Sequence, residues 1–130
     1  MAYSLTELQL ALMQILWSRG EATVVQVQDG LDRPLAQSTV ATLLSRLEKK
    51  GLVTHRTEGR QYVYRATVDE PEVRRSMVEE FTELAGELFA GDVAAMVSHL
   101  LTARDVAPED LARVKALIEA RERELEEEDE

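Results

Sequence analysis

The chain contains no cysteine, and this absence removes several classes of function together. Disulfide bonds, thiol nucleophiles and cysteine-ligated metal sites all require that sulfur atom. The sequence also has no apolar run long enough to cross a membrane, and its first residues lack the charged start and apolar core of a signal peptide. We therefore expect a cytoplasmic protein with no membrane partner.

Patterns that mark catalytic or metal-binding sites are also absent. His55 and His99 share no cluster of possible ligands, so each is interpreted as a surface or packing residue. The sequence has no HExxH or GxSxG motif, no glycine-rich phosphate loop and no dinucleotide fingerprint. The carboxylates are spread over helix surfaces and the C-terminal tail. We therefore predict no enzymatic activity, no metal site and no cofactor.

Positive charge is scarce in the whole chain but concentrated in one block. The net charge is −10, which at first argues against a nucleic-acid partner. Residues 33–65, however, carry seven basic and two acidic groups, a net charge of +5. Residues 1–32 have a net charge of −3 and residues 66–130 a net charge of −12. This segregation favours a DNA-facing surface on the middle block.

Residues 36–51 lie in this block and predict a helix with two contrasting faces. The apolar stripe consists of Val40, Leu43, Leu44 and Leu47 at helical spacing. The opposite face carries short polar side chains first and basic ones towards its end. Short polar side chains let a helix approach base edges closely, and basic side chains reach phosphates. An ordinary amphipathic surface helix has the same pattern, so the neighbouring segments decide between the two interpretations.

Those segments predict a winged helix-turn-helix domain. Capping-box patterns at Thr6 and Thr23 start two helices ahead of the two-faced helix, giving a helix-turn-helix arrangement. Residues 52–66 then change to strand-forming residues around the turn signal Glu58-Gly59-Arg60, which predicts a β-hairpin wing. Tyr62 and Tyr64 share one face of the second strand and either pack on the helices or bind phosphates.

The remainder of the chain predicts three helices that need a partner surface. They begin near Asp69, at Val93 and at Pro108, and are too few and too short to enclose a core. A second copy of the chain would cover their apolar stripes, because a two-fold interface uses the same surface twice. The predicted dimerisation residues are Met77, Phe81, Leu84, Leu88, Val93, Met96, Val97, Leu100, Leu101, Leu111, Val114 and Ile118.

The fold class is therefore mainly α with a small β-hairpin wing. We predict a winged helix-turn-helix DNA-binding domain at residues 1–67 and a helical dimerisation domain at residues 68–130. The residues expected to face the major groove are Gln37, Ser38, Thr39, Thr42 and Arg46. Those expected to bind phosphates are Lys49, Lys50, Arg56 and Arg60.

Residues 38–53, Ser-Thr-Val-Ala-Thr-Leu-Leu-Ser-Arg-Leu-Glu-Lys-Lys-Gly-Leu-Val, closely resemble the recognition helix of the BlaI/MecI penicillinase-repressor family. The early Leu5-Thr-Glu-Leu-Gln and Met13-Gln-Ile-Leu-Trp17 and the later Tyr62-Val-Tyr64 fit the same family, and the resemblance covers the whole chain. It implies a homodimeric winged-helix repressor that binds palindromic double-stranded DNA operators and blocks transcription.

The resemblance carries over to particular positions. Thr39, Thr42 and Arg46 match family positions that face DNA, whereas Ala41 stands where members often have a basic residue, so the operator sequence does not carry over. Classical members are inactivated by proteolysis between the dimerisation helices. The matching region, near His99-Leu100, differs from the family's asparagine–phenylalanine bond, so a regulatory protease is an open expectation. The cysteine-rich metal-sensing motif of CopY relatives is excluded.

Two alternatives follow from the same residues. One is a ligand-responsive winged-helix regulator of the MarR type, which a pocket lined by both the winged domain and the dimer helices would favour. The other is an acidic dimeric adaptor that binds proteins and never DNA; the net charge favours it and the +5 block opposes it.

Overall fold

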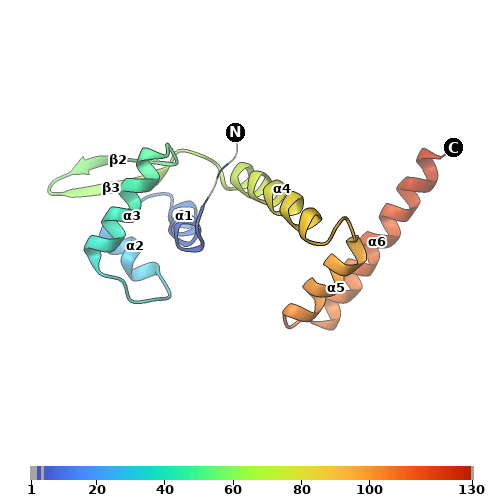
Figure 1. The fold of residues 1–130 in the computed structure, drawn as a ribbon. Coiled ribbons are helices and arrows are strands. Elements are labelled where there is room, and N and C mark those ends of the chain that lie inside the picture. Colours follow the sequence, from blue (N-terminus) through green and yellow to red (C-terminus); the bar gives the residue numbers. More distant parts are fainter. Residues whose placement is uncertain (1–2, 4, 130) are drawn as a thin grey trace. The chain divides into compact units, whose positions relative to one another are not determined.

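The computed structural model describes residue 3 and residues 5–129, which are mostly helical with one small antiparallel sheet. The elements are α1 (Glu7–Arg19), β1 (Ala22–Thr23), α2 (Val24–Gly30), α3 (Gln37–Lys49), β2 (Val53–Glu58), β3 (Gln61–Ala66), α4 (Glu70–Leu88), α5 (Val93–Ala103) and α6 (Pro108–Glu128) (Figure 1). The predicted fold class is confirmed. The chain divides into two units, Met1–Thr82 and Glu83–Glu130, and the predicted DNA-binding segment lies within the first.

Helices α1 and α2 begin at the two predicted capping boxes. The Thr6 hydroxyl accepts a hydrogen bond from the Gln9 backbone N–H at 3.1 Å, and the Gln9 side chain accepts one from the Thr6 N–H at 3.1 Å. Thr23 and Gln26 repeat the arrangement at 3.2 and 2.9 Å. Each box satisfies two backbone donors that a helix start leaves unpaired, which fixes where the helix begins.

The apolar stripe of α3 lies in the core of the first unit. Val40, Leu44 and Leu47 are fully buried, and they pack in one cluster with apolar side chains from α1, α2 and the sheet, among them Leu12 and Leu16. Leu43, the fourth predicted member, is only half-buried at the edge of this cluster. Because one face of α3 is held by the core, its orientation and therefore its outward face are fixed.

The end of α3 is fixed by a hydrogen-bonded motif around Gly51. The Leu52 N–H donates to the Leu47 carbonyl at 3.0 Å and the Gly51 N–H to the Glu48 carbonyl at 2.9 Å, which is the Schellman pattern. Gly51 has a φ of 81°, a conformation that side chains with a Cβ disfavour. The chain therefore turns sharply from α3 into β2.

The sheet has three strands in the order β1-β3-β2, one strand more than the predicted hairpin. The pairs Ala22↔Tyr64 and Thr23↔Val63 add β1 antiparallel to β3. This strand was missed because two residues cannot show a period-two pattern, and Thr23 also caps α2. The sheet places the segment after α1 beside the wing.

The hairpin itself follows the prediction. Its register runs from Val53↔Ala66 to Glu58↔Gln61, with Gly59 and Arg60 as the two-residue loop. Gly59 has a φ of 63° and Arg60 has no positive φ, which is the arrangement of a type II′ turn. This turn matches the twist of the strands and keeps the tip of the wing short.

The first part of α4 is attached to the first unit. Val73 is 1% exposed, and Tyr3 donates hydrogen bonds from its backbone N–H to Ser76 Oγ at 3.1 Å and from its hydroxyl to Glu72 at 2.8 Å. Just before α4, the Val68 carbonyl accepts a bond from Trp17 Nε1 at 2.9 Å. The only tryptophan therefore anchors the connection between the wing and α4.

Helices α5 and α6 have well-defined starts but few buried side chains. Asp92 caps α5 by accepting from the Ala95 N–H at 3.0 Å, and Pro108 occupies the first turn of α6, as predicted. No residue of α5 or α6 within the described range is fully buried in one copy of the chain. The apolar stripes of these helices are thus available to a partner surface.

Candidate nucleic-acid interface

The outward face of α3 is exposed over its full length. Every predicted DNA-contacting residue on or beside this helix is exposed, namely Gln37, Ser38, Thr39, Thr42, Arg46, Lys49 and Lys50. The hydroxyl of Thr42 donates to the Ser38 carbonyl at 3.0 Å, so its proton is used within the helix and its oxygen keeps the capacity to accept. The helix therefore presents short polar groups near its start and cations near its end, the arrangement that groove binding requires.

The basic side chains of the site fall into two groups. Lys50 Nζ donates to Gln9 Oε1 at 3.3 Å, and the Arg56 guanidinium bonds Glu21 and also Glu58 at 2.9 Å. Arg46, Lys49 and Arg60 are exposed, and within residues 5–129 no ion pair engages them. The predicted DNA-contacting cations therefore differ in how much of their hydrogen-bonding capacity is already used.

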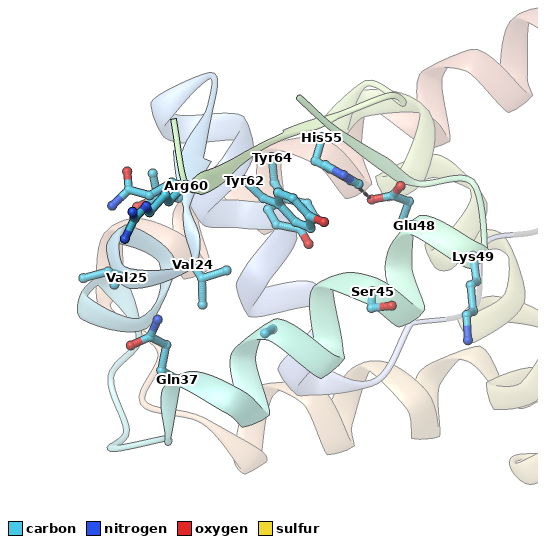
Figure 2. Close-up of a pocket in the computed structure, with 13 residues that line it drawn as sticks. Val24, Val25, Gln37, Ser45, Glu48, Lys49, His55, Arg60, Tyr62 and Tyr64 are labelled. Atoms are coloured by element: carbon cyan, nitrogen blue, oxygen red, sulfur yellow. Dashed lines mark hydrogen bonds and ion pairs between the residues drawn. The ribbon is translucent and has the colours of Figure 1, made fainter. Parts of the chain in front are cut away.

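A cleft of about 700 Å³ lies between α3, the start of α2 and the wing (Figure 2). From α3 it is lined by Gln37, Ala41, Ser45, Glu48 and Lys49, and from the wing by His55, Arg60, Gln61, Tyr62 and Tyr64. Val24 and Val25 contribute an apolar end beside Arg60, while Lys49 lies at the other end in Figure 2. The cleft thus joins the helix and the wing into one continuous surface.

The floor of this cleft is aromatic. His55 stacks on Tyr62 with ring centroids 4.1 Å apart, and Tyr64 lies 5.3 Å from His55. The His55 Nδ1 is 2.6 Å from Glu48 Oε1, which ties the wing to α3 (dashed line in Figure 2). Tyr64 is 4% exposed and Tyr62 is 49% exposed, so the first packs in the interior and the second is about half exposed.

The register of the hairpin explains this arrangement. Directly paired residues share a face, so the pairs His55↔Tyr64 and Thr57↔Tyr62 put the aromatic side chains on one face. Arg56 pairs with Val63 and therefore leaves from the opposite face. From the sequence, His55 is expected to stand alone and Tyr62 is not among the predicted site residues, whereas the structure stacks the two rings. The cross-strand pairing of the predicted hairpin was the signal that could have grouped them.

The charges around the wing are mutually stabilised. Hydrogen bonding to Glu21, and then to Glu58, raises the pKa of Arg56, while hydrogen bonding to Arg56 lowers the pKa of Glu21. On the cleft side, burial raises the pKa of Tyr64 above the ordinary value of 10.0, with Glu48 adding to the effect. Tyr64 is therefore a neutral group at physiological pH.

The residues that the structure describes offer no other chemistry at this surface. No group of three or more histidine and acidic side chains among them could hold a metal ion. No single described helix is long and apolar enough to span a membrane, and α4 with α5 meets the length and composition criteria only as a bent pair. A two-faced helix beside a β-hairpin, with an exposed polar and cationic surface, defines the class of winged-helix DNA-binding proteins.

Comparison with known proteins identifies the family. The family model for the penicillinase repressor matches residues 5–120, so the chain belongs to the penicillinase repressor family. The members of this family are DNA-binding transcriptional repressors and not enzymes.

Individual relatives match different shares of the chain. The penicillinase repressor of Bacillus licheniformis is 25% identical over 117 residues, 88% of this chain and 89% of its own. An uncharacterized 16.5 kDa protein of Latilactobacillus sakei is 33% identical over 96 residues, and this match spans 72% of this chain and 66% of that protein. The transcriptional regulator BlaI of Mycobacterium tuberculosis is 46% identical over 63 residues, 46% of each chain.

Among solved structures, the DNA-binding domain of the repressor BlaI is 30% identical, with a TM-score of 0.48. The matched region covers 54% of this chain and 90% of the BlaI domain. The CopR repressor structure is 34% identical, with a TM-score of 0.43, and covers 52% of this chain and all of that one.

Proposed function

We propose that this protein is a homodimeric transcriptional repressor that binds palindromic double-stranded DNA operators in the cytoplasm. The observation that supports it best is the exposed outer face of α3, where Thr42 and Arg46 stand one turn apart with no carboxylate paired to Arg46 among residues 5–129. A dimer would present two such helices to two operator half-sites.

In this proposal the predicted site residues divide into two tasks. Those that would contact base edges in the major groove are Gln37, Ser38, Thr39, Thr42 and Arg46. Lys49 and Arg60, at the two ends of the cleft, would hold the phosphates of the strand that passes between helix and wing (Figure 2). Lys50 and Arg56 were predicted for the same task. Their bonds to Gln9 and to two carboxylates would have to be exchanged for phosphates.

The test is an equilibrium binding measurement on a duplex selected by the wild-type protein from a randomised library. If each protomer neutralises three or four phosphates, log K should fall against log salt with a slope on the order of −5 to −7 for the dimer. A scrambled duplex of the same length is the control for specificity. Absence of binding to any duplex at low salt would contradict the proposal and favour the acidic adaptor.

The homodimer is proposed from the apolar side chains that one copy leaves uncovered. Of the predicted dimerisation residues, Phe81, Leu84, Leu88, Val93, Leu100, Leu111 and Ile118 are exposed, whereas Met77, Met96, Val97, Leu101 and Val114 are half-buried. Leu88 is 75% exposed and Ile118 53% exposed. Apolar surface of this extent on a soluble chain is typical of an interface with another copy.

Sedimentation equilibrium tests the dimer. The wild-type protein should have twice the 14.6 kDa mass of one chain. Replacing exposed Leu88 and Ile118 together by glutamate should shift it towards the monomer, because charges would be buried without partners. Glu87→Gln, beside Leu88 on α4, is the control. A monomeric wild-type protein at micromolar concentration would exclude the homodimer.

The release signal is unidentified, and the candidate carried over from the family resemblance is proteolysis between the dimerisation helices, near His99 and Leu100, which lie within α5. Both residues are exposed, although the segment is helical and must open before a protease can bind it as an extended strand. A variant that carries Leu100→Pro should be cleaved faster than wild type by the regulatory protease or by a general protease used as a probe. Equal cleavage rates for the two proteins would argue against an opening of α5 as the limiting step.

A further inference from the structure

Arg56 occupies an unusual electrostatic position for a DNA-contacting residue. Its guanidinium bonds both carboxylate oxygens of Glu21, one of them at 3.1 Å, and one oxygen of Glu58 at 2.9 Å. The group of three side chains carries a net charge of −1. A phosphate approaching Arg56 would have to displace two carboxylates that then remain beside it and repel it.

The strand register points in the same direction. Arg56 pairs with Val63 and leaves the wing on the face opposite His55, Tyr62 and the cleft. Arg60 lines the cleft, and within residues 5–129 no carboxylate forms an ion pair with it. The two arginines of the wing therefore differ both in direction and in the charges that surround them.

The position of Glu21 indicates what the Arg56 pair does. Glu21 lies between the end of α1 and β1, at one edge of the sheet, whereas Arg56 lies on β2 at the other edge. The pair thus links edge strand β2 to the residue just before the other edge strand, β1, across the central strand β3. A fork-shaped guanidinium on a carboxylate has a fixed geometry, which suits it to hold the wing at a set angle to the helices.

On the basis of the proposed DNA-binding function, we propose that Arg56 is a positioning residue that holds the wing through Glu21, and that Arg60 is the wing's phosphate-binding cation. Glu21 then supports DNA binding although it carries the charge that DNA repels. This consequence separates the proposal from the simpler view in which every arginine of the wing binds phosphate.

The decisive variant is Glu21→Gln, because the two views predict opposite signs. If Arg56 binds phosphate, removing Glu21 frees it and tightens binding to the selected duplex. If Arg56 positions the wing, Glu21→Gln weakens binding by about 1.4- to 5-fold, the range expected for an exposed ion pair. Asp32→Asn, an exposed carboxylate in the loop before α3, measures the effect of charge alone.

Two further variants assign the phosphate contact. Arg60→Gln should reduce the magnitude of the salt slope by about 0.9 per protomer, whereas Arg56→Gln should change it by less than half as much. The double variant Glu21→Gln with Arg56→Gln should bind no more weakly than Arg56→Gln alone, since both changes remove one interaction. Binding by Glu21→Gln equal to or tighter than that of Asp32→Asn would overturn the proposal, as would a full loss of slope in Arg56→Gln.

Amide hydrogen exchange of the free protein tests the positioning role without DNA. The amides of residues 53–66 should exchange faster in Glu21→Gln and Arg56→Gln than in wild type. Their exchange rates should be the same in Arg60→Gln as in wild type. If the wild-type protein binds no duplex, the proposed function fails while this measurement still decides whether the pair holds the wing. Unchanged exchange in Glu21→Gln would overturn the positioning role even if DNA binding is confirmed.

Discussion

The substitution Arg46→Ala probes the proposed reading face most directly. Arg46 is exposed on α3, one turn beyond Thr42, and no ion pair engages it within residues 5–129. Its loss therefore leaves no unpaired partner inside the protein. Alanine also favours a helix, so the free energy of unfolding should change by no more than about 0.5 kcal/mol.

The effect on binding follows from the contact that the side chain would make. A bidentate contact between an arginine and a guanine is worth about 1–3 kcal/mol, which corresponds to roughly 5- to 150-fold in affinity per half-site. A dimer loses the contact twice. Since the contact reads bases, affinity for the scrambled duplex should fall less than affinity for the selected one.

Fluorescence anisotropy with a labelled duplex measures both affinities at a fixed salt concentration. Arg75→Ala on α4 is the matched control, because it removes one exposed arginine that lies off α3. A thermal melt of each variant establishes that the fold is unchanged. If Arg46→Ala binds the selected duplex as tightly as wild type, the assignment of the outer face of α3 as the reading face is wrong.

Three further predictions concern the stability of the residues that hold α3 and the wing in place. Leu44→Ala should lower the free energy of unfolding by about 2–5 kcal/mol in urea denaturation, because it empties a fully buried core position. Gly51→Ala should lower it by about 1 kcal/mol, because alanine would have to adopt a φ of 81°. Burial raises the pKa of Tyr64, because the folded protein favours the neutral phenol. The contribution of this phenol to the free energy of unfolding is therefore complete below pH 10 and is lost as the pH rises through the raised pKa. When the pH is raised from neutral to strongly alkaline, the free energy of unfolding measured by urea titration should therefore fall less for Tyr64→Phe than for wild type.

Features encoded by neighbouring residues could be predicted from the sequence. Two helix starts were predicted from the pairs Thr6 with Gln9 and Thr23 with Gln26, because a capping box is contained in four residues. The stripe through Val40 and Leu44 likewise gave the buried face of α3 and, by exclusion, its exposed face. The DNA contacts assigned to that face stay predictions.

Features that depend on distant residues could not be predicted in this way. Arg56 was predicted to bind phosphate although one of its carboxylate partners, Glu58, is only two positions away; its other partner, Glu21, lies 35 positions earlier in the chain. Lys50 bonds Gln9 across 41 positions. No local pattern records such pairings, so a count of basic residues overstates how many cations a surface offers to DNA.

The hydrogen bonds around Gly51 have a consequence for how binding preference can change. Thr67 donates to the Gly51 carbonyl through its hydroxyl at 2.6 Å and to the Leu52 carbonyl through its N–H at 2.9 Å, so both ends of the hairpin are fastened to the exit of α3. These two bonds, one from a side chain and one from the backbone, hold the base of the hairpin at the exit of α3. If the outward side of α3 reads bases as proposed, substitutions there would change which bases are preferred without moving the base of the hairpin.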